Sequence, residues 1–367
     1  MTLNYIRKLF IQVFQIPIYY IFGFGCRNKN IWLFGAWKGH ILSDNPKYLF
    51  DYVRKNTGIE AVWITKNRTL SNPEGGIYYA YSFQGILYCI KASKGFVTHG
   101  ADDLVPCFIR GISLINLTHG SPVKKIANDV SFNRLGALTP IFDKIKHLII
   151  PSEARFDYIV CANKRDNEIF RSAYKIKKDV YTLGYPRWVA LNDSQLKFGN
   201  FEKIVLYAPT LRYMNKVELK PFDFDGFDSF VEYLEKNNQL LIIRPHPVMK
   251  LDYSKLGSNN IIVLDSSKVE DINTLLSSID VLVSDYSSII YDFAIINENI
   301  ILLSPDSEDY INNDVGVYGD YYKDTPGKYV RSWTEVRDIV SKTDRVDRNP
   351  LDAFSASEKI YNKFKGL

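Results

Sequence analysis

The stretch "DVLVSDYSSIIYDFAIINENIILLSPD", residues 280–306, combines the strand and turn signals that decide the fold. Its two apolar runs, 281–283 and 300–303, are typical of buried strands, and the residues between them suffice for a helix. Continuous Val/Ile/Leu runs joined in this way predict parallel strands covered on both faces. The polar stretch 284–288 therefore follows the carboxyl end of a buried strand.

The same alternation of short apolar runs and longer helix-like stretches continues along the chain after residue 26. Two sets of runs meet near residues 187–202, which predicts two doubly wound, Rossmann-like α/β domains, 27–195 and 196–367. Packing of the last helix against the first domain is left open. The expected strands are 31–35, 60–66, 95–100, 113–120, 147–152, 179–186, 203–210, 239–247, 261–265, 280–285 and 299–306.

Composition limits the class of protein. The 367 residues are 46% hydrophobic and 14% aromatic, which is typical of a folded chain. The net charge of +5 suits an anionic substrate or membrane but is too small to indicate a nucleic-acid partner. The four cysteines are widely spaced, so neither a zinc site nor a disulfide framework is indicated, and a reducing cytoplasm is expected.

The N-terminal segment, 1–26, contains the apolar run "LFIQVFQIPIYYIFGFG", residues 9–25, interrupted by Gln12, Gln15 and Pro17. This run falls short of the ~20 apolar residues of a spanning helix, and it lacks a signal-peptide cleavage site. A membrane-associating helix lying in the plane of the bilayer is favoured, with a docked amphipathic helix and a true span as alternatives.

Small hydroxyls and charges follow the strands of the second half. Ser287 and Ser288 could cap the next helix, or they could hold a phosphate together with backbone N–H groups. Asp292 could face the same cleft one turn along or only stabilise the first turn of the helix. Thr210 and Arg212, in "YAPTLR", follow another strand, and the forked donors of arginine suit a phosphate.

Two histidines stand in loops that directly follow apolar runs. His246 lies between two prolines in "RPHP", beside Arg244, so its backbone is constrained and its imidazole is preorganised. His119 precedes Gly120, which permits close approach of a ligand, and the residues after Pro122 predict the start of a helix. His99, in a second "THG", is a weaker candidate for a general base.

Several familiar site motifs are missing from the sequence. It contains no GxxxxGK[ST] loop and no GxGxxG after a strand, which disfavours P-loop and dinucleotide-binding proteins. It also contains no HExxH and no GxSxG motif.

The motifs that are present, in this order, resemble those of the CDP-glycerol glycerophosphotransferase family, which makes teichoic acids and related poly(alditol phosphate) chains. They extend over roughly residues 30–345. The motifs are "THGSPVKKI" (118–126), "GYPR" (184–187), "YAPTLR" (207–212), "RPHP" (244–247), the stretch 280–306 and "DVGVYGDYYKDTPGKYV" (314–330).

The resemblance implies a glycosyltransferase-B-like fold, with an acceptor-side first domain and a donor-binding second domain. It implies transfer of glycerol phosphate, or a related alditol phosphate, from a CDP carrier to an acceptor hydroxyl, with release of CMP. By position, His119 resembles the general base and His246 a second essential histidine near the donor phosphates. The residues that resemble donor-site residues are Thr210, Arg212, Arg244, Ser287, Ser288 and Asp292.

The resemblance also implies partners and a location. A lipid-linked glycan acceptor at the cytoplasmic face of the membrane is expected, with peripheral attachment of the enzyme. No cofactor is required by the sequence, although Mg²⁺ stays open, as do glycerol versus ribitol, single transfer versus polymerisation and the oligomeric state. Trp188 and Val189 depart from the family pattern after "GYPR", which puts acceptor-side or hinge contacts there in doubt. The alternative function is a nucleotide-sugar glycosyltransferase of surface polysaccharide synthesis.

Overall fold

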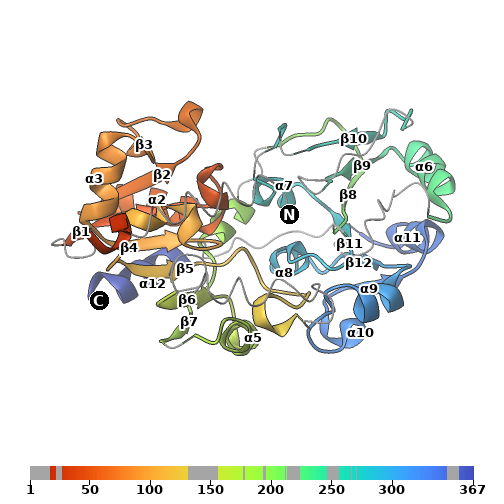
Figure 1. The fold of residues 1–367 in the computed structure, drawn as a ribbon. Helices are drawn as coiled ribbons and strands as arrows, with labels where there is room; N and C mark the ends of the chain where they lie inside the picture. Colours follow the sequence, from red (N-terminus) through yellow and green to blue (C-terminus); the bar gives the residue numbers. More distant parts are fainter. Residues whose placement is uncertain are drawn as a thin grey trace, which may run out of the picture. The chain divides into compact units, whose positions relative to one another are not determined.

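The chain folds into two compact units (Figure 1). The first unit comprises Met1–His119, Leu135–Arg187 and Phe354–Leu367, and the second comprises Gly120–Arg134 and Trp188–Ala353. The computed structural model describes residues 17–21, 27–130, 156–176, 178–192, 196–210, 212, 224–245, 256–265, 267–269, 271–344 and 355–367.

In the described part of the first unit, a seven-stranded parallel sheet has the order β3-β2-β1-β4-β5-β6-β7. The chain therefore starts in the middle of the sheet, builds one edge and then crosses to build the other. The strands are β1 (Asn28–Phe34), β2 (Glu60–Thr65), β3 (Ile77–Tyr79), β4 (Ala92–Val97), β5 (Ser113–Asn116), β6 (Tyr158–Cys161) and β7 (Val180–Thr182). The α-helices are α2 (Asp44–Asn56), α3 (Phe83–Lys91), α5 (Lys164–Tyr174) and α12 (Ser355–Lys365).

The second unit repeats this topology. Its described residues form a six-stranded parallel sheet of order β10-β9-β8-β11-β12-β13. The order in which strands are added again reverses beside the first strand, between β8 and β11. The strands are β8 (Lys203–Ala208), β9 (Gln239–Ile243), β10 (Ile261–Val263), β11 (Val281–Ser284), β12 (Ile300–Leu303) and β13 (Lys328–Val330). The α-helices are α6 (Phe227–Lys236), α7 (Asn273–Leu276), α8 (Ile289–Phe293), α9 (Ser307–Asn313), α10 (Tyr321–Asp324) and α11 (Trp333–Val340).

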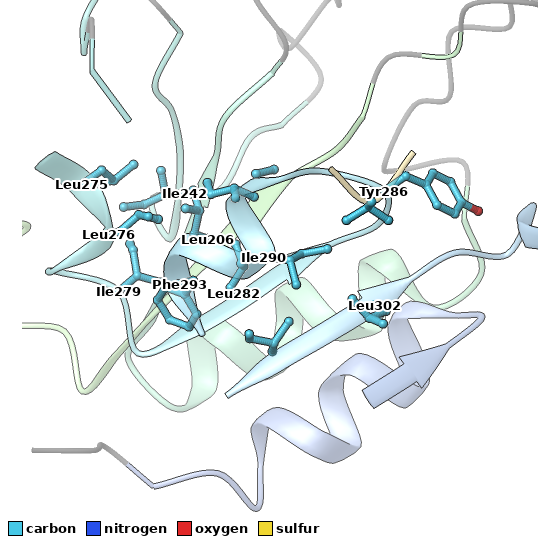
Figure 2. Close-up of a cluster of buried hydrophobic side chains, with 14 of the residues drawn as sticks. Leu206, Ile242, Leu275, Leu276, Ile279, Leu282, Tyr286, Ile290, Phe293 and Leu302 are labelled. Atoms are coloured by element: carbon cyan, nitrogen blue, oxygen red, sulfur yellow. The ribbon is translucent and has the colours of Figure 1, made fainter. Parts of the chain in front are cut away.

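The sheet of the second unit has an apolar layer on both faces, as continuous Val/Ile/Leu strands require. On one face, α8 packs Ile290 and Phe293 against Leu206 of β8 and Leu282 of β11 (Figure 2). On the other face, α6 and α11 cover the same strands around the buried Trp333. The connection between β11 and β12 is therefore anchored to the sheet by the apolar side chains of α8.

The last helix belongs to the first unit. Ile360 and Phe364 of α12 are buried in the apolar cluster that also contains Leu49 of α2 and Trp32 of β1. The chain thus leaves the second unit near residue 353 and completes the core of the first. Relative to the expected ranges, the change of unit falls at Arg187 rather than at residue 195, and Gly120–Arg134 joins the second unit.

The predicted α/β class with two Rossmann-like domains is confirmed. The predicted helix after Pro122 is wrong, because Val123–Ile126 instead runs beside Gly316–Tyr318, with an antiparallel bridge between Lys124 and Val317. The predicted strand 147–152 lies outside the described residues. Within the described ranges, no helix combines the length and apolar character needed to cross a membrane.

Candidate active site

Most of the predicted site residues of the second unit lie at the carboxyl edge of its sheet. Thr210 and Arg212 follow β8, and Ser287 and Ser288 follow β11, which is the neighbouring strand. The strand order reverses between β8 and β11. In doubly wound sheets, ligands bind at this reversal point, outside the carboxyl ends of the strands.

Arg212 is held by two acidic side chains of its own unit. Its guanidinium donates from NH1 to Asp285 at 2.8 Å, and from Nε and NH2 to Asp306 at 2.7 and 3.1 Å. NH1 also donates to the carbonyl of Thr210 at 2.7 Å. Burial alone would lower the pKa of Arg212, but the charge of Asp285 and the bonds to Asp306 outweigh it and raise this pKa. Arg212 therefore braces the loop after β11.

Asp285 is the centre of this arrangement and is 2% exposed. Its Oδ1 accepts from the backbone N–H groups of Thr210, at 2.9 Å, and of Tyr286, at 2.7 Å. Its carbonyl accepts from the Tyr321 hydroxyl at 3.2 Å. Because one carboxylate joins the ends of β8 and β11 and Arg212, the two loops form a single rigid structure.

Tyrosines surround the Arg212 guanidinium. The rings of Tyr286 and Tyr310 stack, with their centroids 3.7 Å apart and their planes inclined by 4°. The guanidinium carbon lies 4.9 Å from the Tyr286 centroid and 5.0 Å from the Tyr310 centroid. The Tyr286 hydroxyl donates to Asp306 at 3.2 Å. Burial, followed by the charges of Asp306 and Asp285, raises the pKa of Tyr286, so the phenol stays neutral and acts as a donor.

The hydroxyls that follow β8 and β11 are little used by the fold. Ser288 occupies the position before α8, with helical backbone angles and no side-chain capping bond in the described structure. Ser287 Oγ accepts only a long bond, 3.4 Å, from the Ile289 N–H. Among the described residues, the buried Thr210 Oγ1 has no hydrogen-bond partner. Helix capping thus accounts for none of these hydroxyls well, and a ligand-binding role stays a prediction.

Asp292 is buried in α8 and accepts from the indole N–H of Trp188 at 2.9 Å. Trp188 is the first residue of the second unit after Arg187. Asp292 is therefore engaged by the segment where the chain changes unit, a role that the sequence does not reveal. Its predicted part in donor binding stays a prediction.

Arg244 follows β9 and is 7% exposed. Its side chain donates to the Leu264 carbonyl at 2.9 Å, and its backbone N–H donates to the backbone carbonyl of Tyr207 at 2.8 Å. Burial lowers the pKa of Arg244, partly offset by Asp265 and Asp271. His246, two residues further along, lies outside the described residues, and its predicted role stays a prediction.

His119 is exposed and is the last residue of the first of three segments that make up the first unit, three residues after β5. Thr118, directly before it, has a φ of +53°, which is rare for a β-branched residue. The Asn116 side chain holds this conformation by accepting from the Thr118 N–H at 2.7 Å. Asn45 of α2 donates to the carbonyls of Leu117 and Thr118 at 3.1 and 3.0 Å. Strain maintained in this way is characteristic of functional sites.

The residues after His119 belong to the second unit. Lys125 donates its N–H to Gly316 at 2.9 Å, and Val123 accepts from Tyr318 at 2.9 Å. Lys124 is half-buried. Burial lowers the pKa of Lys124, opposed by the charges of Asp285 and Asp314. The "HG" motif therefore stands where the chain passes from one unit to the other.

Sequence reasoning missed several residues of the site. Asp285 and Asp306 stand two and three residues after the apolar runs 281–283 and 300–303 of the opening stretch. Their positions were visible in the sequence, although their pairing with Arg212 was not. Asn45 carried no recognisable signal, because it lies more than 70 residues from the loop that it holds. No group of three or more potential metal-binding side chains occurs in the described ranges.

The sequence profile of the family described as CDP-Glycerol:Poly(glycerophosphate) glycerophosphotransferase matches residues 19–366. The chain belongs to this family. The predicted activity, transfer of glycerol phosphate from CDP-glycerol in teichoic acid synthesis, is thereby confirmed at the level of the family.

Two curated relatives match over most of their length. The chain is 28% identical to a teichoic acid poly(glycerol phosphate) polymerase of Bacillus spizizenii, over 92% of this chain and 89% of that protein. It is 27% identical to a teichoic acid glycerol-phosphate transferase of Staphylococcus aureus, over 93% of this chain and 90% of that protein. The solved structure of the wall teichoic acid polymerase TagF has the same fold, with a TM-score of 0.72 at 21% identity, covering 100% of this chain and 94% of the solved chain.

Proposed function

We propose that this glycerophosphotransferase acts on a hydroxyl of a lipid-linked glycan acceptor at the cytoplasmic surface of the membrane. The donor is CDP-glycerol, and the acceptor oxygen forms a new bond to the phosphorus of the glycerol phosphate. The bond from that phosphorus to the bridging oxygen of the pyrophosphate breaks, and CMP leaves. The observation that carries the proposal is the pair of braced strand ends in the second unit, which offers hydroxyls beside a rigid loop.

Donor binding is assigned to the edge formed by β8 and β11. Thr210 Oγ1 is buried without a partner in the described structure, and Ser288 makes no capping bond there. Both hydroxyls can donate to phosphate oxygens, and Arg244 and His246 follow the adjacent strand β9. Arg212 is assigned a supporting part, because four of its N–H donors already bind Asp285, Asp306 and Thr210.

His119 is assigned the role of general base. It takes the proton of the attacking hydroxyl, and a histidine is suited to this because its pKa lies close to neutrality. His246 is assigned to the donor phosphates, where an imidazole N–H stabilises the charge that develops as CMP leaves. Mg²⁺ could neutralise the same phosphates, so the assay includes an arm with EDTA.

Peripheral membrane attachment is assigned to the first unit. The apolar stretch of residues 9–25 supports it. Tyr20 and Ile21 also support it, because 45% and 67% of their surfaces are exposed. Flotation of the full chain with phosphatidylglycerol vesicles tests this assignment against the variant Tyr20→Ser/Ile21→Ser. Equal flotation of both proteins would remove these two residues from the contact with lipid.

The decisive experiment measures CMP release from CDP-glycerol or CDP-ribitol with a short lipid-linked disaccharide acceptor, with UDP-sugars as controls. Acceptor-dependent CMP release from one CDP-alditol is expected. Turnover of a UDP-sugar without CMP release would reject the proposal and favour a nucleotide-sugar glycosyltransferase.

A further inference from the structure

The two "THG" sequences follow neighbouring strands of the first unit. β4 and β5 pair in parallel, with Val97 opposite Asn116, and each continues at the same sheet edge into Thr-His-Gly. The imidazoles of His99 and His119 face each other, with centroids 4.9 Å apart and planes inclined by only 7°. The repeated tripeptide therefore builds a stacked pair of histidines from strand ends that are adjacent in the sheet.

His99 is itself held by a chain of hydrogen bonds. The Thr98 hydroxyl donates to Asp103 Oδ2 at 3.1 Å and lies 2.9 Å from His99 Nδ1. A hydroxyl has one proton, and here it is directed to the carboxylate, so Thr98 accepts from Nδ1–H. Asp103 is fully buried and also accepts from the backbone N–H groups of Thr98 and His99, both at 2.8 Å. The orientation of the His99 ring is thus determined by Thr98 and Asp103, which are hydrogen-bonded to each other.

The other neighbour of His99 is Trp37, whose ring centroid is 4.8 Å away. Trp37 and Lys38 both have positive φ values, +50° and +57°, in the turn after β1. This turn is tied to the same carboxylate, because the Lys38 N–H donates to Asp103 Oδ1 at 2.7 Å. Backbone strain at three non-glycine residues around the pair, including Thr118, indicates a site that is built for a function.

We infer that His99 is a positioning residue for His119. Its anchored ring covers one face of the exposed His119 imidazole and limits the rotation of that imidazole, so that a proton-accepting nitrogen is held in one direction. Direct transfer of a proton between the rings is excluded, because stacked imidazoles do not point their nitrogens at each other. This inference rests on the proposed role of His119 as the general base.

The test compares His99→Ala with His99→Phe in the acceptor-dependent CMP assay. His99→Ala removes the stacked ring, and we expect kcat to fall about tenfold to a hundredfold while the KM for CDP-glycerol stays nearly constant. His99→Phe retains an aromatic face and should recover a large part of the lost kcat. His40→Ala, an exposed histidine of the same unit, is the matched control and should leave kcat unchanged.

Two outcomes would overturn the inference. Full activity of His99→Ala would show that the stack has no effect on the reaction. Inactivity of His99→Phe equal to that of His119→Ala would show that His99 itself exchanges a proton with substrate. Thermal unfolding of each variant identifies any loss that arises from misfolding.

A second measurement does not depend on turnover. The chain has five histidines, so the ring signals of ¹³C-labelled histidine can be assigned by single substitutions. The His119 signals should move when His99 becomes alanine, because the ring current of the stacked partner is lost, and unchanged signals would contradict the stack. If wild-type protein releases no CMP from either CDP-alditol, the proposed function fails while this measurement still tests the stack.

Discussion

Trp188 donates its indole N–H to the buried carboxylate of Asp292 across 2.9 Å. The preceding residue, Arg187, is fixed in the first unit, where its side chain pairs with Asp44 at 2.8 Å. The chain therefore passes from the first unit to the second at the peptide bond between Arg187 and Trp188, and both side chains are anchored by hydrogen bonds. Trp188 thus has a structural function in this chain.

The first prediction concerns this indole. Trp188→Phe keeps much of the apolar contact but removes the donor to a buried carboxylate, so we expect the free energy of unfolding to fall by about 1–3 kcal/mol. Urea unfolding measures this change. Asp292→Asn is the control, because its amide oxygen can still accept from Trp188, and a loss larger than that of Trp188→Phe would assign the stability to other contacts of Asp292.

The second prediction concerns the buried ion pair of Asp285 with Arg212. Asp285→Asn leaves a buried guanidinium without one of its charge partners, and we expect a loss of about 3–5 kcal/mol, measured by chemical unfolding. Asp338→Asn breaks an exposed pair with Arg337 in the same unit and should cost less than about 1 kcal/mol. Similar losses in both variants would argue against a central role for Asp285.

The third prediction separates capping from ligand binding at Ser288. We expect Ser288→Ala to raise the KM for CDP-glycerol while leaving the free energy of unfolding unchanged, because no capping bond is lost. Ser332→Ala is the matched control: Ser332 forms a capping box with Glu335 at the start of α11, so this variant should lose about 1 kcal/mol without a change in KM. The reverse pattern would make Ser288 a structural residue.

The fourth prediction concerns Asn45, which holds the loop before His119. Asn45→Ala removes the donors to the Leu117 and Thr118 carbonyls, so we expect both a lower melting temperature and a lower kcat. Asn56→Ala, at the exposed end of the same helix, should change neither quantity by much. Normal kcat in a folded Asn45→Ala variant would show that the loop keeps its shape without this contact.

The fifth prediction concerns the two histidines assigned to catalysis. His119→Ala and His246→Ala should each lower CMP release by a factor of about 10²–10⁴ or more, the usual contribution of general acid–base groups. Circular dichroism should show unchanged secondary structure in both. Near-normal turnover in either variant would remove that histidine from the mechanism.

The sequence determined the interior strands of the sheet in the second unit. β8, β9, β11 and β12 are continuous apolar runs, and burial on both faces leaves such runs few alternatives. The three-residue edge strands β3 and β13 were not predicted, whereas the equally short edge strands β7 and β10 fall within the predicted ranges 179–186 and 261–265. β6 was also missed, although its run "YIVC" is apolar.

The tertiary structure alone decided which residues of the site meet. Local sequence identified the carboxyl ends of strands and hence Thr210, Ser287 and Ser288 in the second unit and His119 in the first as candidates, because parallel strands place their carboxyl ends on one edge of their own sheet. The pairing of Arg212 with Asp285, and of Trp188 with Asp292, joins residues 73 and 104 positions apart. The stacking of His99 on His119 likewise depends on the strand order, since only neighbouring strands bring two identical tripeptides into contact.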